Sequence, residues 1–390
     1  MRTENEWMSL RRQFPTLSKL NYLNTCSLGL LSNSSKEGIQ TYLDLWEEYG
    51  ASAWYSHWLE EIDSVRHEFS QLINCSLMET AIQPSISVGL SSLISGMDLK
   101  KRNKVITTEM DFPTVAYQLL AQKKNGVDVQ ILPSEDKITI DVERFRDSID
   151  DNTALVATSR VFFNSGYIQN VEEIGNICRN KGALLLIDDY QGCGQIPMDV
   201  ANTNVDILLT GGLKWLLGGP GISYMYVNRD LVGQLNPSFT GWFAHKQQFD
   251  FNPHQMVFKD DARRLENGTP SISAVYSAKA GMALINRIGV EEIRHRTNRL
   301  TMKLISALID AGFSLNIPDS ADEHASITCI QAGDPAALVT ELKKAGIITD
   351  ARPGGLRISP YFYNNDADIL NFVESIVKLR DISPEYFNVV

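Results

Sequence analysis

One lysine, Lys214, lies in a glycine-rich connection between two apolar runs of the sequence. The runs, residues 205–209 and 222–227, have the length and the β-branched or aromatic content of buried strands. A lysine between them is partly desolvated, which lowers its pKa and leaves more of the amine uncharged and able to attack a carbonyl carbon. Taken alone, a lysine on such a turn is more often an ordinary surface residue, so a chemical role needs a second signal.

The second signal is a pair of carboxylates at the end of an earlier apolar run. Residues 183–187 follow a helical pattern and do not alternate, which predicts a buried parallel strand, and Asp188 and Asp189 come directly after it. Ligands bind at the carboxyl ends of strands in open α/β sheets. An acid there and a buried lysine after the next strand predict a site for pyridoxal 5′-phosphate (PLP). The lysine forms a Schiff base with this cofactor, and the acid keeps its pyridine nitrogen protonated.

Two motifs resemble those of the fold-type I PLP enzymes of the aminotransferase class V family, which includes cysteine desulfurases, kynureninases and isopenicillin N epimerase-like proteins. They read Asp188-Asp-Tyr-Gln191-Gly-Cys-Gly and Thr210-Gly-Gly-Leu-Lys214-Trp-Leu-Leu-Gly-Gly-Pro-Gly. The resemblance runs from about residue 22 to residue 376. It implies that Asp188 faces the pyridinium nitrogen and Gln191 the ring oxygen, with Asp189 as a neighbour if the register does not slip by one. Thr210 is expected to contact the cofactor.

Further cofactor contacts follow from the same resemblance. The family binds the phosphate at the start of a helix, where unpaired N–H groups and the helix dipole attract anions. Ser87, with its hydroxyl, and Ile86, with its backbone, match that position, although a serine there also serves as a simple helix cap. Phe112 is expected to stack on the cofactor ring. Thr269, in Gly-Thr-Pro, implies a homodimer in which this side chain reaches the phosphate of the neighbouring subunit.

The C-terminal part contains a candidate ligand for the substrate carboxylate. Arg357 lies in a short strand-like run and can bind a carboxylate through two parallel hydrogen bonds. It matches the carboxylate-binding arginine of the family. Asn24, near the N-terminus, is expected to line the substrate pocket. The expected partner is therefore a small-molecule amino-acid substrate.

The sequence departs from the family pattern at three places. The stretch before Arg357, residues 345–356, contains no cysteine, which disfavours the persulfide chemistry of cysteine desulfurases. Leu213 stands where desulfurases have His and kynureninases have Tyr. Residues 160–166 replace a more polar run of the desulfurases, so the contacts to the cofactor ring are expected to differ.

Composition and charge narrow the function classes. The chain has 390 residues, and its 43% hydrophobic and 21% charged residues are typical of a soluble globular enzyme. A net charge of −11 argues against a nucleic-acid partner. No apolar stretch reaches membrane-spanning length, and the five cysteines form no CxxC pair, so a reduced cytoplasmic protein is expected. The six histidines show no spacing typical of a metal site.

Strand and helix patterns alternate along the chain, which indicates an α/β fold. The resemblance implies a large PLP-binding domain with a mostly parallel seven-stranded sheet flanked by helices, plus a smaller α+β C-terminal domain. We expect residues 1–20 to pack with the small domain, residues 21–274 to form the large domain and residues 275–390 the small one. Strands are predicted at residues 104–107, 127–132, 153–158, 183–187 and 325–331, and helices at 89–99, 273–288, 290–311, 334–345 and 366–379.

The expected function is to transform an amino acid through an external aldimine and a Cα carbanion, with transaminase or lyase chemistry. A kynureninase-like hydrolase or an amino-acid epimerase would share the first steps. Phe112 and the Arg357 region favour the kynureninase alternative, and Leu213 opposes it. A non-catalytic PLP-binding protein is the alternative outside enzymes.

Overall fold

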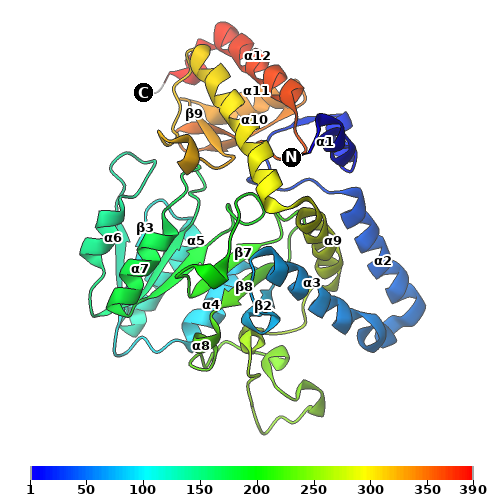
Figure 1. The fold of residues 1–390 in the computed structure, drawn as a ribbon, viewed down its shortest axis with the longest axis vertical. Helices are drawn as coiled ribbons and strands as arrows, with labels where there is room; N and C mark the ends of the chain where they lie inside the picture. The colour runs from blue at the N-terminus through cyan, green and yellow to red at the C-terminus, as the bar shows by residue number, and fades with distance from the viewer. Residues whose placement is uncertain (1, 389–390) are drawn as a thin grey trace.

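The computed structural model describes residues 2–388, which form a seven-stranded sheet surrounded by helices and a smaller C-terminal layer above it (Figure 1). The strand order in the large sheet is β2-β8-β7-β6-β5-β3-β4, and β8 runs antiparallel to both of its neighbours. The other pairings are parallel, which confirms the predicted mostly parallel seven-stranded sheet. The strands are β2 (Thr80–Gln83), β3 (Lys104–Thr108), β4 (Asp128–Leu132), β5 (Thr153–Ser159), β6 (Leu184–Asp188), β7 (Ile207–Gly211) and β8 (Ser223–Val227).

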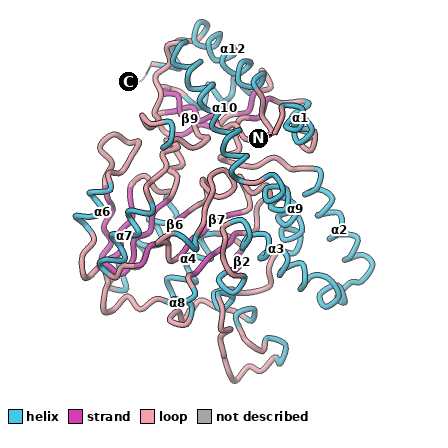
Figure 2. Tube along the Cα trace, viewed as in Figure 1, coloured by secondary structure: helices cyan, strands magenta, loops and turns pink. Residues whose placement is uncertain are grey.

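Helices cover both faces of this sheet because alternate residues of each strand point to opposite faces and nearly all of them are apolar. On β6, Leu186 packs in one core with helices α4, α5 and α8, whereas Leu185 and Ile187 pack in another with α3, α7 and α9. Figure 2 shows the strands in the interior of this part, with helices around them. The helices of this part are α2 (Asn33–Tyr49), α3 (Leu59–Leu72), α4 (Ile86–Gly96), α5 (Pro113–Ala121), α6 (Val142–Ser148), α7 (Val171–Lys181), α8 (Arg229–Val232) and α9 (Ile272–Ile288).

The C-terminal layer contains a three-stranded antiparallel sheet, in the order β11-β12-β9, packed against helices. A short parallel pair, β1 with β10, brings the N-terminal segment to it, and Arg11 of α1 forms an ion pair of 2.6 Å with Asp368 of α12. The domain limits at residues 20 and 274 stay predictions. The elements are α1 (Glu4–Arg11), β1 (Asn21–Tyr22), α10 (Val290–Asp310), β9 (Thr328–Gln331), α11 (Pro335–Lys344), β10 (Ile347–Ile348), β11 (Asp350–Arg352), β12 (Gly355–Ile358) and α12 (Asp366–Ile382).

Two local expectations need correction. The helix predicted to begin at residue 89 begins at Ile86, because the Ser85 side chain accepts a hydrogen bond from the Val88 N–H and caps the helix there. The strand before it, β2, is absent from the predicted strands, since four residues ending at a proline are too short a pattern to recognise. Among the described residues, no helix is long and apolar enough to cross a membrane.

Candidate active site

The carboxyl end of β6 and the segment that follows β7 border a cavity of about 320 Å³. It brings together six of the residues expected at the cofactor: Asp188, Gln191, Lys214, Phe112, Ile86 and Ser87. Its other walls are mostly apolar or aromatic and include Pro84, Val161, Phe163, Tyr190, Leu213 and Ile222. The cavity therefore lies where an open α/β sheet binds its ligand, and its size and apolar walls are typical of a small-molecule site.

The Lys214 amine lies against aromatic rings inside this cavity. Its Nζ is 4.5 Å from the ring centroid of Tyr190 and 5.9 Å from that of Phe112. Burial lowers the pKa of Lys214 to about 8, and the nearby Arg357 charge acts in the same direction, while Cys26 and Asp188 oppose the shift. About one tenth of the amine is therefore uncharged at pH 7, far more than for an ordinary lysine, and the uncharged form is the one that attacks a carbonyl.

Asp188 is the acid at the end of β6 and is only 5% exposed. Burial raises its pKa to about 7, a hydrogen bond of 3.0 Å from the Tyr190 N–H and the Lys214 charge lower it, and the Asp111 and Asp189 charges raise it. A carboxyl group in this range becomes charged when a cation is placed beside it. Asp188 can therefore pair with a protonated ring nitrogen.

Asp189, the residue after Asp188, is paired with an arginine outside the cavity lining. Its side chain is fully buried and forms two hydrogen bonds with Arg160, of 2.7 and 2.8 Å. Arg160 also donates to the carbonyl oxygens of Ile196 and Pro197. The pair of Arg160 and Asp189 therefore stabilises the turn after β6, while Asp188 borders the cavity.

The Gln191 amide is held at both ends. Its Nε2 donates to the Cys26 carbonyl at 3.1 Å, and its Oε1 accepts from the Trp215 indole N–H at 2.8 Å. The indole donor fixes which end of the amide is oxygen, because it can only donate. One N–H of Gln191 is left for a ligand in the cavity.

The first turn of α4 borders the cavity as expected for a phosphate cup. Ser85 is the cap, so its hydroxyl oxygen is engaged with the Val88 N–H at 3.3 Å. Ile86 and Ser87 occupy the first two positions of the helix, whose N–H groups have no partner inside the helix. This is the arrangement of backbone donors that binds an anion at a helix N-terminus.

The four other expected residues, Thr210, Asn24, Thr269 and Arg357, are not among the residues that line the cavity, and their roles stay predictions. Thr210 is buried on β7, and its hydroxyl donates to the Asp189 carbonyl at 3.3 Å. The Asn24 side chain donates to the Thr349 carbonyl at 3.4 Å. Thr269 is exposed beside a second, small cavity that Gln83 and Glu266 also line.

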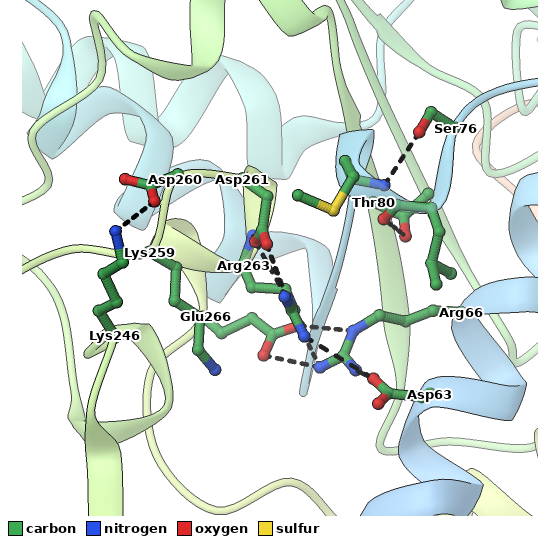
Figure 3. Close-up of polar contacts among 12 residues, drawn as sticks. Asp63, Arg66, Ser76, Thr80, Lys246, Lys259, Asp260, Asp261, Arg263 and Glu266 are labelled. Carbon is green, nitrogen blue, oxygen red and sulfur yellow. Dashed lines mark hydrogen bonds and ion pairs between the residues drawn. The ribbon is translucent and has the colours of Figure 1, made fainter.

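The turn that contains Thr269 is anchored by an ion pair (Figure 3). The Glu266 carboxylate accepts hydrogen bonds of 2.7 and 2.8 Å from the Arg66 guanidinium of α3, and one of 3.0 Å from the Ile82 N–H of β2. Both charged side chains are 3% exposed. Glu266, three residues before Thr269, therefore has a structural role, because it fixes this turn to α3 and β2.

Arg357, the expected carboxylate ligand, lies on β12 and is 1% exposed. Its Nη1 donates to the Phe163 carbonyl at 2.6 Å, and its Nη2 donates to Ser27 at 2.8 Å and to Asp350 at 2.6 Å. Phe163 lines the cavity, so the guanidinium lies directly behind the cavity wall.

Asp111 and Tyr190 are two further functional candidates that the sequence analysis does not single out. Asp111 precedes Phe112 and accepts five hydrogen bonds from residues at the ends of β3 and β5: from the Thr107, Thr108 and Thr158 hydroxyls and the Thr108 and Ser159 N–H groups. These bonds fix the backbone from which Phe112 extends. Tyr190 packs over Gly211, where an added Cβ would lie 2.3 Å from the phenol ring. The aspartate at a strand end beside several threonines is a readable signal, but no local pattern predicts the tyrosine contact.

Comparison with known proteins identifies the family. A family model described as aminotransferase class-V matches residues 50–372. The chain belongs to the aminotransferase class-V family. An uncharacterized aminotransferase of Bacillus subtilis (strain 168) is 32% identical over 368 residues, covering 94% of this chain and 96% of that protein. A kynureninase of Bacillus anthracis is 26% identical over 377 residues, covering 92% of this chain and 88% of the relative.

Solved structures agree on the fold of this class-V chain. The apo cysteine desulfurase from Thermococcus onnurineus NA1 matches with a TM-score of 0.86 at 20% identity, covering 97% of this chain and 98% of that one. A C-DES mutant with glycine covalently linked to its PLP cofactor matches with a TM-score of 0.87 at 20% identity, covering 94% and 98%. The chain is therefore a PLP-dependent enzyme of class V with the type I fold.

The donor set around the cavity fits PLP. The ligand has a phosphate, an aromatic ring, a ring nitrogen and an aldehyde, and the cavity offers an anion-binding helix start, the Phe112 ring, the Asp188 acid and the Lys214 amine. These four groups lie at or shortly after the ends of four strands of the same sheet, β2, β3, β6 and β7. Within residues 2–388, no group of three or more His, Cys, Asp or Glu side chains is arranged to hold a metal ion.

Proposed function

We propose that this class-V enzyme transforms an amino acid by transaminase or lyase chemistry, with Lys214 and Asp188 as its catalytic residues. One observation supports this most directly: the lysine amine and the buried acid border a single cavity, with Arg357 behind its wall. When bound, PLP would act as the electron sink for the electrons left on Cα after the α-proton departs.

Each residue of the site has a distinct part in the proposal. Lys214 would take the α-proton on its uncharged amine and could return it to another carbon, because its pKa of about 8 lies close to neutral pH. Asp188 would hold the charge that keeps the ring nitrogen protonated. Arg357 would orient the substrate by its carboxylate. Phe112, Phe163 and Leu213 would exclude water from the reacting atoms.

A kynureninase-like hydrolase is the second candidate. The rings of Phe112 and Phe163 meet edge to face at 5.4 Å and give the cavity an aromatic wall. A kynureninase is also among the relatives at 26% identity. Leu213 opposes this candidate, because it brings an aliphatic side chain to the position before the lysine. An amino-acid epimerase is the further alternative.

Cysteine desulfurase chemistry has less support. The segment before Arg357 is the tight β11–β12 hairpin, and it contains no cysteine that could serve as a nucleophile. Among the described residues, the cavity wall also contains no cysteine. The proposal further includes a cytoplasmic homodimer in which Thr269 reaches the phosphate of the neighbouring subunit.

Exchange of the α-proton in ²H₂O tests the proposal, because every candidate reaction of an amino acid at this site begins with loss of that proton. A panel of amino acids that includes kynurenine and cysteine is incubated with the enzyme, and proton NMR follows the Cα–H signal and any product. We expect exchange with at least one amino acid, loss of exchange in Lys214→Ala, and full exchange in the matched control Lys303→Ala. No exchange with any amino acid, in protein that retains PLP, would contradict the proposed amino-acid chemistry.

A further inference from the structure

Arg357 forms an ion pair with a carboxylate of its own chain, that of Asp350. Asp350 on β11 is the cross-strand partner of Arg357 on β12, so the two side chains lie on the same face of the hairpin. The Asp350 Oδ2 accepts from Arg357 Nη2 at 2.6 Å and from the Ser27 hydroxyl at 2.5 Å. The group expected to bind a substrate carboxylate is therefore bound to one from its own chain.

The same Asp350 oxygen also contacts a second arginine. Arg352 lies two residues along β11 and points to the same face, with its Nη2 2.8 Å from Asp350 Oδ2. The two arginines differ in environment, because the Arg357 side chain is 1% exposed and that of Arg352 is 28% exposed. One carboxylate thus bridges a buried and a partly exposed cation, which leaves a surplus of one positive charge.

One donor of the buried arginine has no partner. The Nε of Arg357 is buried and makes no hydrogen bond within the described part of the chain. Such a donor is costly unless a ligand satisfies it. A carboxylate that binds a guanidinium side-on uses Nε together with a neighbouring Nη group. On Arg357 that neighbour is Nη2, which Asp350 and Ser27 occupy. An incoming carboxylate must therefore compete with Asp350 for Nη2.

We propose that Asp350 is a specificity-determining residue that occupies Arg357 in the absence of substrate and passes to Arg352 when a substrate carboxylate binds. The inference rests on the proposed function of Arg357. A ligand carboxylate gives Arg357 a new negative partner in place of Asp350, and Asp350 stays paired with Arg352. A neutral or cationic amine cannot displace Asp350 without leaving the buried arginine unpaired, which is costly. The site would therefore accept amino acids and reject simple amines of the same shape.

Calorimetric titration of the purified holoenzyme with 3-phenylpropionate and 3-phenylpropionamide tests this exchange. Neither probe has an amine, so neither reacts at the cofactor, and the phenyl group suits the aromatic wall. Asp350→Asn keeps the shape of the side chain but removes its charge. We expect the carboxylate to bind this variant about tenfold more tightly than the wild type, the lower end for a hydrogen bond to a charged group, and the amide to bind equally to both.

Arg352→Gln provides a second, independent measurement at a partly exposed position. In the wild-type background it should weaken carboxylate binding about threefold or more, because Asp350 loses its alternative partner and stays on Arg357. In the Asp350→Asn background it should have much less effect. Asp366→Asn is the matched control for Asp350→Asn and should leave carboxylate binding unchanged. Its carboxylate also bridges two cations, Arg299 and Lys303, at 2.8 Å each.

Three results would overturn the inference. Unchanged or weaker carboxylate binding in Asp350→Asn would mean that Asp350 only aligns Arg357. An equal effect of Arg352→Gln in both backgrounds would mean that Arg352 contacts the ligand directly. Absence of carboxylate binding to every variant would remove Arg357 as the carboxylate ligand. The PLP content and α-proton exchange of the same preparations report separately on the proposed function.

Discussion

The buried pair of Arg160 and Asp189 behind the cofactor cavity leads to a quantitative prediction for Arg160→Met. The substitution keeps much of the side-chain volume but removes the guanidinium. It breaks two hydrogen bonds to Asp189, of 2.7 and 2.8 Å, and two to the carbonyls of Ile196 and Pro197, of 3.0 and 2.7 Å. Asp189 is 0% exposed, so its carboxylate loses its charged partner out of contact with bulk solvent.

The expected cost is large because the remaining charge stays buried. Removing one partner of a buried ion pair destabilises a protein by about 3–5 kcal/mol, whereas replacing both partners by apolar groups is often neutral. We therefore expect Arg160→Met to lower the free energy of unfolding by about 3–5 kcal/mol. The double variant Arg160→Met/Asp189→Leu should recover most of that loss, despite the two carbonyls that remain without a donor.

The loss of unfolding free energy in Arg160→Met should also depend on pH. Burial raises the pKa of Asp189, and the Arg160 charge opposes this rise. Without Arg160, the folded-state pKa lies above the unfolded value of about 3.9, so the protonated side chain is favoured in the folded state. The stability that protonation of Asp189 contributes to the folded state is fully present below the unfolded pKa. It is lost as pH rises, by about 1.4 kcal/mol per pH unit, until the folded pKa is reached. The deficit of Arg160→Met should therefore be smaller at pH 5 than at pH 7.

Urea unfolding of the wild type and both variants, followed by tryptophan fluorescence at pH 5 and pH 7, measures these differences. A deficit below about 1 kcal/mol, or one that is equal at both pH values, would refute the argument that an unpaired buried charge causes the loss. A double variant as unstable as the single one would show that the carbonyls of Ile196 and Pro197, left without a donor, cause the loss of stability.

Three further variants probe the site itself. Gly211→Ala places a Cβ 2.3 Å from the Tyr190 ring, so it should displace that ring from Lys214 and weaken PLP binding, as measured by dialysis; unchanged retention of PLP would contradict the contact. Asp188→Asn should retain PLP but slow α-proton exchange by roughly 100-fold or more, since the amide cannot hold the charge opposite the ring nitrogen; a rate near that of the wild type would exclude this role. Arg357→Ala should weaken binding of a carboxylate substrate by about 1.5–3 kcal/mol, or roughly 10–100-fold, and leave the binding of a neutral analogue unchanged; equal losses for both ligands would indicate general damage to the pocket.

The sequence predicts the sheet well because its strands are nearly continuous apolar runs. Residues 183–187 and 104–107 differ from β6 and β3 by one residue, since both faces of these strands are buried and the apolar signal extends along the whole strand. β2 escapes prediction because only four residues form it. The predicted start of α4 is three residues late, because a serine-rich segment before a helix is typical of a loop as well as of a cap.

The sequence predicts those residues of the candidate site that lie at or just after the ends of sheet strands. Asp188 and Lys214 each follow a strand of the same sheet, so topology alone brings them together. The pairing of Arg357 with Asp350 is not predictable, because it depends on the register of a short hairpin and on Ser27 from the other end of the chain. The contact of Tyr190 with Lys214 likewise requires the shape of the packed turn over Gly211.

The absorption spectrum of purified wild type and Lys214→Ala, each before and after addition of PLP and gel filtration, tests the central claim most directly. The account predicts a yellow band that stays with the wild-type protein and is absent or altered in Lys214→Ala, because the Lys214 amine is the one that lies in the cavity beside Asp188. The same band in both proteins would contradict the assignment of Lys214. A wild type that stays colourless after addition of PLP would contradict the cofactor site as a whole.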